Sequence, residues 1–142
     1  MKVLVDTSIW SLALRRGKPK SAAPARELRS LISDHRVHII GPIRQELLSG
    51  IREEVQFRRL ENRLAAFPDL PIQTDDYITA ARFFNFCRAR GIQGSNTDFL
   101  ICAVAVRYRL AIYSIHDDFA LYARHIPIAL HQAKAPAGTD YK

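Results

Sequence analysis

Val3-Leu4-Val5-Asp6-Thr7-Ser8 is the stretch that decides the fold of this chain. Its three apolar residues, two of them β-branched, predict a short buried strand. Asp6 ends this strand, and the apolar spacing from Ile9 to Leu14 predicts a helix next, which Thr7 or Ser8 can cap. Ligands bind outside the carboxyl ends of strands in open α/β sheets, so Asp6 is placed for chemistry. Taken alone, such an aspartate is more often a strand terminator and helix cap, and only further acids favour a site.

The composition is that of one globular domain. Of the 142 residues, 48% are hydrophobic and 25% charged, which suits a continuous core and excludes a disordered chain. No apolar run approaches the roughly 20 residues that span a bilayer, and the early acid at Asp6 argues against a signal peptide. Cys87 and Cys102 lie among apolar residues, which favours buried free thiols. We therefore expect a cytoplasmic protein without a membrane partner.

The charge balance favours a polyanionic partner. The formal net charge is +7, from 21 Lys and Arg against 14 Asp and Glu, and such a field speeds encounter with nucleic acid. Residues 15–20 combine basic side chains with Gly17 and Pro19, which predicts a loop. This loop is either a solvated linker or an edge that contacts phosphates.

Short apolar runs alternate with helical patterns along the chain. Further strands are expected over residues 37–40, 70–72, 110–113 and 126–130. Helices are expected over residues 21–33, 41–50, 53–66 and 74–91. A further helix is expected from Gly94-Ser95-Asn96 through the apolar run that ends at Val106, and a short one after Phe119 to about Ala123. In the fourth of these helices, capped by Thr74 or Asp75, the stripe from Tyr77 to Cys87 is expected to face the core. This alternation predicts an α/β three-layer sandwich, in which a mostly parallel sheet of four or five short strands has helices on both faces. We expect residues 1–131 to form the one domain and residues 132–142 to form a flexible tail.

Four acidic positions follow strands or open helices. Glu46 lies early in the helix after the second strand, and Asp98 lies in the first turn of the helix that starts at Gly94-Ser95-Asn96. Asp117 and Asp118 follow the strand over residues 110–113. Right-handed crossovers bring such positions, with that of Asp6, to one rim of a parallel sheet. Helix capping accounts for Asp98 and Asp118 but explains Asp6 less well.

A cluster of carboxylates needs a proton or a cation. Two of them about 5 Å apart repel by roughly 3 kcal/mol at an effective dielectric of about 20. Oxygen ligands suit Mg²⁺ or Mn²⁺, and the sequence has no Cys/His cluster with zinc spacing. Such a metal can bridge a phosphate oxygen, activate a water and stabilise in-line displacement at phosphorus. A basic rim would deliver the anionic substrate.

The stretches around these acids resemble a known family. Four segments are similar to the motifs of PIN domains. They are Val3–Ser8, the Arg-Gln-Glu-Leu-Leu-Ser-Gly segment around Glu46, the Gly94–Ala103 segment and the acidic-Phe segment that ends at Phe119. More narrowly, the chain resembles VapC-type toxins of bacterial toxin–antitoxin pairs from Met1 to about Leu130. The resemblance implies a PIN-like sandwich and an Mg²⁺- or Mn²⁺-dependent endoribonuclease, a hydrolase of RNA. It also implies a homodimer and a cognate antitoxin protein as partner.

The resemblance assigns Asp6 and Asp98 as metal ligands and Glu46 as a further catalytic acid. The last motif of the family reads Thr-x-Asp-x-Asp-Phe, whereas this chain has Ser-Ile-His-Asp-Asp-Phe over residues 114–119, with His116 in place of the first aspartate. Either Asp117 takes that place as third ligand, or His116 joins the site and favours Mn²⁺, or the site is weakened. We take Asp117 as the ligand here, with His116 and Asp118 as its substitutes.

The remaining roles follow from the chemistry. Glu46 and Asp117 would orient or deprotonate the attacking water, directly or through a second ion. The side chains expected to hydrogen-bond the ligating carboxylates are Thr7, Ser8 and Asn96.

Two other functions compete with a nuclease. A phosphoaspartyl enzyme of the haloacid-dehalogenase kind also has an aspartate after its first strand, but needs a second one two positions on, where Ser8 stands. A catalytically weak or silent module that binds nucleic acid or a protein partner would fit the basic charge equally well. Metal-dependent RNA cleavage that is lost in Asp6→Asn distinguishes the nuclease from this module.

Overall fold

A four-stranded, all-parallel sheet forms the centre of the computed structural model, which describes residues 1–14 and 23–133. The expected loop over residues 15–20 and most of the expected tail lie outside these residues. The strand order is β2-β1-β3-β4, and Val3 pairs with Val37 on one side and Ala111 on the other. The strands are β1 (Val3–Val5), β2 (Val37–His38), β3 (Ala111–Tyr113) and β4 (Ala129–Leu130).

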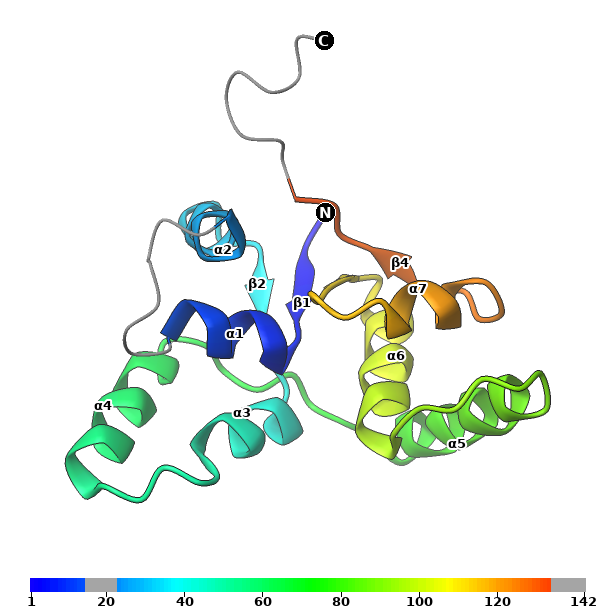
Figure 1. Ribbon diagram of the computed structural model, residues 1–142, viewed down its shortest axis with the longest axis horizontal. Helices are drawn as coiled ribbons and strands as arrows, with labels where there is room; N and C mark the ends of the chain where they lie inside the picture. The colour runs from blue at the N-terminus through cyan, green and yellow to red at the C-terminus, as the bar shows by residue number, and fades with distance from the viewer. Residues whose placement is uncertain (15–22, 134–142) are drawn as a thin grey trace, which may run out of the picture.

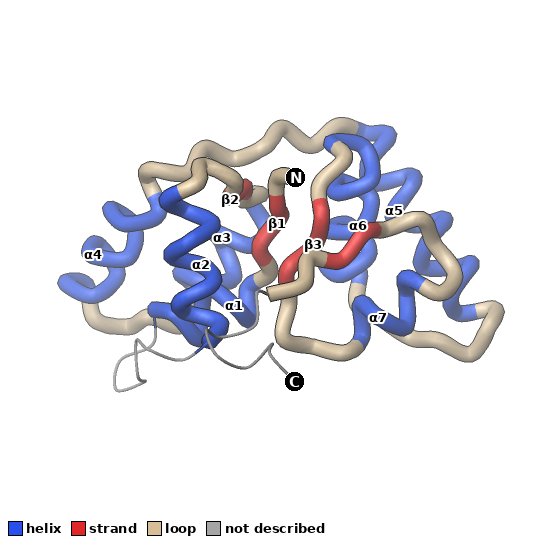
Figure 2. The backbone as a smooth tube through the Cα atoms, turned by 90° about the horizontal axis from the view of Figure 1, so that it is seen from above, coloured by secondary structure: helices blue, strands red, loops and turns tan. Residues whose placement is uncertain are grey.

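Helices cover both faces of this sheet. Figures 1 and 2 show α1 to α4 on one side of the strands and α5 to α7 on the other, which confirms the expected α/β sandwich. The helices are α1 (Thr7–Leu14), α2 (Ala23–Ser33), α3 (Gly41–Leu48), α4 (Glu54–Leu64), α5 (Thr74–Arg88), α6 (Asn96–Tyr108) and α7 (Asp118–Ala123). Among these described helices, none has the length and apolar character needed to cross a bilayer.

The core is built around β1 and α6. The three side chains of β1 are fully buried, as the apolar run at the start of the sequence predicts. Every residue of α6 from Phe99 to Ala105 is buried as well. Ser95 caps this helix, because its hydroxyl accepts a hydrogen bond from the Asp98 N–H. The start of α6, where Asp98 lies, is therefore fixed by both its cap and its core packing.

An ion pair joins α5 to α6. The Arg107 guanidinium donates from Nε to Asp76 Oδ1 at 2.7 Å and from Nη2 to Asp76 Oδ2 at 2.9 Å. The Asp76 carboxylate is only 2% exposed and also accepts the Gln73 N–H. These bonds hold the pKa of Asp76 below its usual range, although burial alone would raise it. A buried carboxylate is stable at this position because a guanidinium neutralises it.

Three local expectations are wrong. Residues 70–72 form no strand, because Pro71 has no N–H and pairing is limited to one isolated bridge between Ile39 and Asp69. Helix α5 is preceded by Gln73 as its cap, not Thr74 or Asp75. Tyr77, which was expected on the buried stripe of α5, is 55% exposed. The neighbouring residue Asp76 takes the buried position on this helix instead.

The first helix begins earlier than expected. The Asp6 carbonyl accepts the N–H groups of Ile9 and Trp10, so Asp6 itself stands at the cap of α1. Thr7 and Ser8 lie in the first turn instead of capping it. The Asp6 carboxylate therefore lies where a buried strand meets a helix N-terminus.

Candidate functional site

The carboxyl ends of β1 and β3 lie next to each other and carry the first part of the site. Val5 pairs with Tyr113, so Asp6 and Ser114 follow on neighbouring strands. The Ser114 hydroxyl donates to Asp6 Oδ2 at 2.9 Å, and the Ser8 hydroxyl donates to the same oxygen at 2.8 Å. Asp6 is only 6% exposed, and its Oδ1 accepts no hydrogen bond from the residues that the structure describes. One oxygen of Asp6 is thus held by hydroxyl groups.

Asp98 enters the site from the first turn of α6. In Figure 1, β1 and β2 point to the same edge of the sheet, where α1, α3 and α6 begin. Asp98 Oδ2 accepts the hydroxyl of Tyr122, on α7, at 2.9 Å. Burial raises the pKa of Asp98, and the charges of Asp6 and Asp118 raise it further, against the hydrogen bonds from Tyr122 and Ser95. Two carboxylates from other segments of the chain, those of Asp6 and Asp118, therefore act electrostatically on Asp98.

The residues of the last acidic motif do not all act on Asp98. His116 and Asp117 are exposed and line a pocket of about 200 Å³ with Ser114 and His131. Neither of them is among the charges that act on Asp98, whereas Asp118, the first residue of α7, is. Of the three candidates named for this motif, Asp118 is the one that the fold brings into electrostatic contact with Asp98.

Of the other residues expected at the site, Glu46, Asn96 and Thr7 make no hydrogen bond to Asp6 or Asp98 among the described residues. Glu46 is exposed on α3, and its charge is not among those that shift the pKa of Asp98. Asn96 lines a separate pocket of about 370 Å³ with Pro42 and Tyr77. The Thr7 hydroxyl is buried without a hydrogen-bond partner among the described residues. Ser8 does bond a carboxylate, as described above for Asp6.

Two residues of this site were missed by sequence reasoning. Ser114 had a signal, because it stands at the Thr position of the family motif. Tyr122 had none, since nothing in the sequence links residue 122 to a carboxylate 24 positions earlier.

The acids of this site have no cationic partner among the residues that the structure describes. Asp76 is paired with Arg107, but the ion pairs of the described chain include neither Asp6, Asp98 nor Asp118. In a chain with net charge +7 this is unusual, because basic side chains outnumber acids. Carboxylates that repel one another and lack a basic partner are suited to a divalent cation.

The donor set fits Mg²⁺ or Mn²⁺ in chemistry. It consists of carboxylate and hydroxyl oxygens, which these hard cations prefer. No three His, Cys, Asp or Glu side chains of the described residues lie close enough together to form a complete cage. Mg²⁺ does not require one, because it commonly keeps several waters and binds through one or two carboxylates and substrate phosphates. Asp6 and Asp98 meet that smaller requirement.

Comparisons with known proteins agree with this fold. A model of the PIN domain family matches residues 3–124, so the chain belongs to the PIN domain family. It is 31% identical over 126 residues to VapC ribonuclease Mb1587 of Mycobacterium bovis and, equally, to Ribonuclease VapC11 of Mycobacterium tuberculosis, covering 86% of this chain and 92% of each relative.

Solved structures share the fold at lower sequence identity. FitAcB from Neisseria gonorrhoeae superposes with a TM-score of 0.73 at 20% identity, over 92% of this chain and 96% of that one. VapBC2 from Rickettsia felis, bound to a DNA fragment from its promoter, gives a TM-score of 0.75 at 16% identity, over 92% and 98% of the two chains. The confirmed expectations are thus the family and the α/β architecture.

Proposed function

We propose that this chain is a divalent-metal-dependent endoribonuclease that acts as the toxin of a toxin–antitoxin pair. The observation that carries the proposal is that Asp6 and Asp98 have no cationic partner among the described residues, while burial and the charges of Asp6 and Asp118 raise the pKa of Asp98. The names of the relatives, which describe VapC ribonucleases, support the same reaction. The net charge of +7 favours an RNA substrate over a neutral one.

In this proposal Asp6 and Asp98 hold an Mg²⁺ or Mn²⁺ ion. Asp118 is proposed in the place that the sequence assigned to Asp117, because its charge is among those that act on Asp98. When bound, the ion would polarise the scissile phosphate and lower the pKa of a water molecule. Glu46, on a helix that starts at the same edge of the sheet, keeps its proposed role of orienting that water.

The hydroxyl groups around Asp6 keep the site ready for the ion. Ser8 and Ser114 fix one oxygen of Asp6, and the Ser8 hydroxyl also accepts the Ile115 N–H at 3.2 Å. The loop after β3 is thereby joined to the first turn of α1. Because Asp6 is nearly fully buried, water has little access to compete for its carboxylate.

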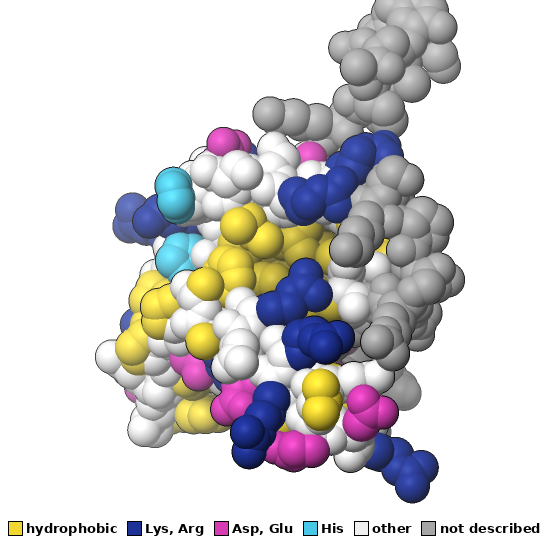
Figure 3. Space-filling view, turned by 90° about the vertical axis from the view of Figure 1, so that its left-hand side faces the viewer, with side chains coloured by type: hydrophobic (Ala, Val, Ile, Leu, Met, Phe, Trp, Pro, Cys, Tyr) yellow, Lys and Arg dark blue, Asp and Glu magenta, His cyan; other side chains and the backbone are white. Residues whose placement is uncertain are grey.

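The partners proposed for this chain are its RNA substrate, a cognate antitoxin protein and a second copy of itself, in the cytoplasm. The structural relatives include toxin–antitoxin complexes, which support an antitoxin. The face of the molecule that carries α2 and α4 gathers apolar side chains between Lys and Arg side chains (Figure 3). A pocket of about 530 Å³ between α2, β2 and the end of α4 includes Ile32, Val37 and Phe67. Such an apolar surface with a basic border suits an amphipathic helix with acidic flanks.

RNA cleavage by the purified full chain tests this function. A 5′-labelled RNA should be cleaved internally with Mn²⁺ or Mg²⁺ and remain intact with EDTA. Asp6→Asn and Asp98→Asn should each lose at least about 100-fold in rate, on the scale of losing a group that stabilises the transition state. Glu54→Gln is the matched control, because Glu54 is an exposed acid that pairs only with Arg58.

A silent binding module would give a different result. The lack of a complete metal cage among the described residues is the observation that favours this second function. RNA binding that survives Asp6→Asn and Asp98→Asn, with no cleavage by the wild type at any metal concentration, would establish the module and reject the nuclease.

A further inference from the structure

We propose that Tyr122 is a positioning residue of the acidic site, and that Gly94 is the residue whose missing side chain allows it to act. The Tyr122 hydroxyl fixes the Asp98 carboxylate in the orientation that receives the metal. This inference rests on the proposed function, since Asp98 matters in this way only if it binds a cation.

The ring of Tyr122 is fixed independently of its hydroxyl. Tyr122 lies on α7 and is 1% exposed. Its ring packs against Phe99 at a centroid distance of 4.7 Å and against Phe119 at 5.4 Å. Phe99 is the residue after Asp98 on α6, so the same helix that carries the carboxylate also fixes the ring. The hydroxyl therefore reaches Asp98 Oδ2 at 2.9 Å from a rigid support.

Gly94 provides the space that the hydroxyl occupies. A Cβ atom at position 94 would lie 2.2 Å from the Tyr122 hydroxyl oxygen, 2.7 Å from Tyr122 Cζ and 2.8 Å from Phe99 Cε2. No side chain fits at such distances. Gly94 does not have the positive φ seen at Gly50 and Gly91, so the backbone conformation does not demand glycine here. The requirement is one of space alone.

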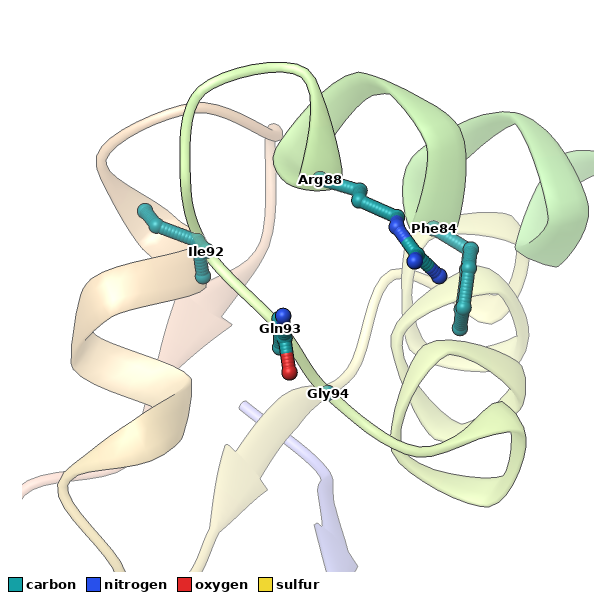
Figure 4. Close-up of a pocket in the computed structure, with 5 residues that line it drawn as sticks. All are labelled: Phe84, Arg88, Ile92, Gln93 and Gly94. Carbon is teal, nitrogen blue, oxygen red and sulfur yellow. The ribbon is translucent and has the colours of Figure 1, made fainter.

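The loop that holds Gly94 is close to both helices. Figure 4 shows the segment from Ile92 to Gly94 running from the end of α5 to the start of α6 and passing beside α7. On another side this segment borders a pocket of about 170 Å³ lined also by Phe84 and Arg88. The loop thus closes over the Tyr122 side chain and keeps its hydroxyl directed at Asp98.

The chemistry of the contact suits a metal ligand. Asp76, which has a structural role, is held by a guanidinium, whereas Asp98 and Asp6 are held by the neutral hydroxyls of Tyr122, Ser8 and Ser114. A neutral donor orients a carboxylate without supplying a positive charge that would compete with the cation. Outer partners of this kind change metal affinity or activity by about 10- to 100-fold when they are removed.

The phenylalanine variant tests the hydroxyl alone. Tyr122→Phe keeps the ring packing and removes only the bond to Asp98. Tyr108→Phe is the matched control: its hydroxyl donates to the Pro71 carbonyl at 2.7 Å, at the opposite end of α6 and about 15 Å along that helix from Asp98. Mn²⁺ affinity is measured by electron paramagnetic resonance of the free ion, beside RNA cleavage and thermal unfolding without metal.

We expect Tyr122→Phe to weaken Mn²⁺ binding by about 10- to 100-fold and Tyr108→Phe to leave it unchanged. Equal Mn²⁺ affinity of Tyr122→Phe and the wild type would overturn the proposal, and so would a wild type that binds no Mn²⁺. Gly94→Ala should weaken Mn²⁺ binding as well, with Gly41→Ala as control, because a Cβ at position 41 meets no atom within 4 Å. If Gly94→Ala does not fold, the result with Tyr122→Phe decides.

The two proposals fail separately. If the wild type cleaves RNA and Tyr122→Phe changes neither Mn²⁺ affinity nor rate, the nuclease stands and the positioning role is rejected. If the wild type binds Mn²⁺, loses affinity in Tyr122→Phe and cleaves no RNA, the positioning role stands and the nuclease is rejected.

Discussion

Replacing Asp76 by alanine separates the stability of the scaffold from the chemistry of the site. The change removes three hydrogen bonds to a carboxylate that is 2% exposed: two from Arg107 and one from the Gln73 N–H. Hydrogen bonds to a charged group contribute about 1.5 to 3 kcal/mol each, but Arg107 regains water in the variant, so we expect a net loss of about 3 kcal/mol in the free energy of unfolding. For a chain of this size, each kcal/mol of lost stability lowers the midpoint of thermal unfolding by about 3 °C, so we expect this midpoint to fall by roughly 10 °C.

Urea denaturation followed by the fluorescence of Trp10 measures this loss, because the indole is 2% exposed in the folded chain and stacks edge-on against Phe67. Glu54→Ala is the control. It also removes an acid from the first turn of a helix, but its ion pair with Arg58 is about 70% exposed on both sides and contributes at most about 0.5 kcal/mol. A loss below about 1 kcal/mol for Asp76→Ala, or equal losses for the two variants, would show that the contact between Asp76 and Arg107 does not stabilise the fold.

The effect of Asp76 also depends on pH. Arg107 lowers the pKa of Asp76 in the folded chain, so its contribution is fully present above the pKa of an unfolded aspartate, about 3.9. It is lost as the pH falls through the lower folded value. The difference in stability between the wild type and Asp76→Ala should therefore shrink below about pH 4, and a difference that grows there would contradict the assigned ion pair.

Three further predictions concern the site and the thiols. Asp118→Asn should slow RNA cleavage by at least about tenfold, on the scale of a lost ligand partner, while Asp117→Asn stays near the wild-type rate; the reverse order in a single-turnover assay would restore Asp117 as the ligand. Mn²⁺ at 100 times its dissociation constant should stabilise the wild type by about 2.7 kcal/mol in thermal unfolding, and this gain should disappear in Asp98→Asn. Cys87 and Cys102 are buried and free, and burial raises the pKa of both thiols, so a disulfide reagent should label neither in the native chain and both in guanidinium; labelling of the native chain would refute their burial.

The elements that the sequence predicts well are those where local pattern and burial agree. Val3-Leu4-Val5 is a strand with every side chain inside, and the apolar run of α6 after Ser95 is a buried helix. In both cases a continuous apolar run matches the burial of the element, and for α6 the capping residue Ser95 agrees with it. The predicted strand over residues 70–72 failed because Pro71 cannot donate to a ladder, so its carbonyl is used instead by Tyr108 and Arg107.

The site could be predicted only in part, because side-chain contacts between distant segments leave little trace in one sequence. The order of strands and helices was enough to place Asp6 and Asp98 at the same edge. It could not indicate that Asp118, and not Asp117, is among the charges that raise the pKa of Asp98. Nor could it show that Gly94, read as part of a helix start, makes room for Tyr122.

Anomalous scattering from crystals of the full chain grown with Mn²⁺ would locate the bound ion. We expect one manganese peak beside the carboxylates of Asp6 and Asp98, and we expect it to be absent from crystals of Asp98→Asn. A peak bound elsewhere, or crystals at saturating Mn²⁺ without a peak at these two residues, would contradict this expectation.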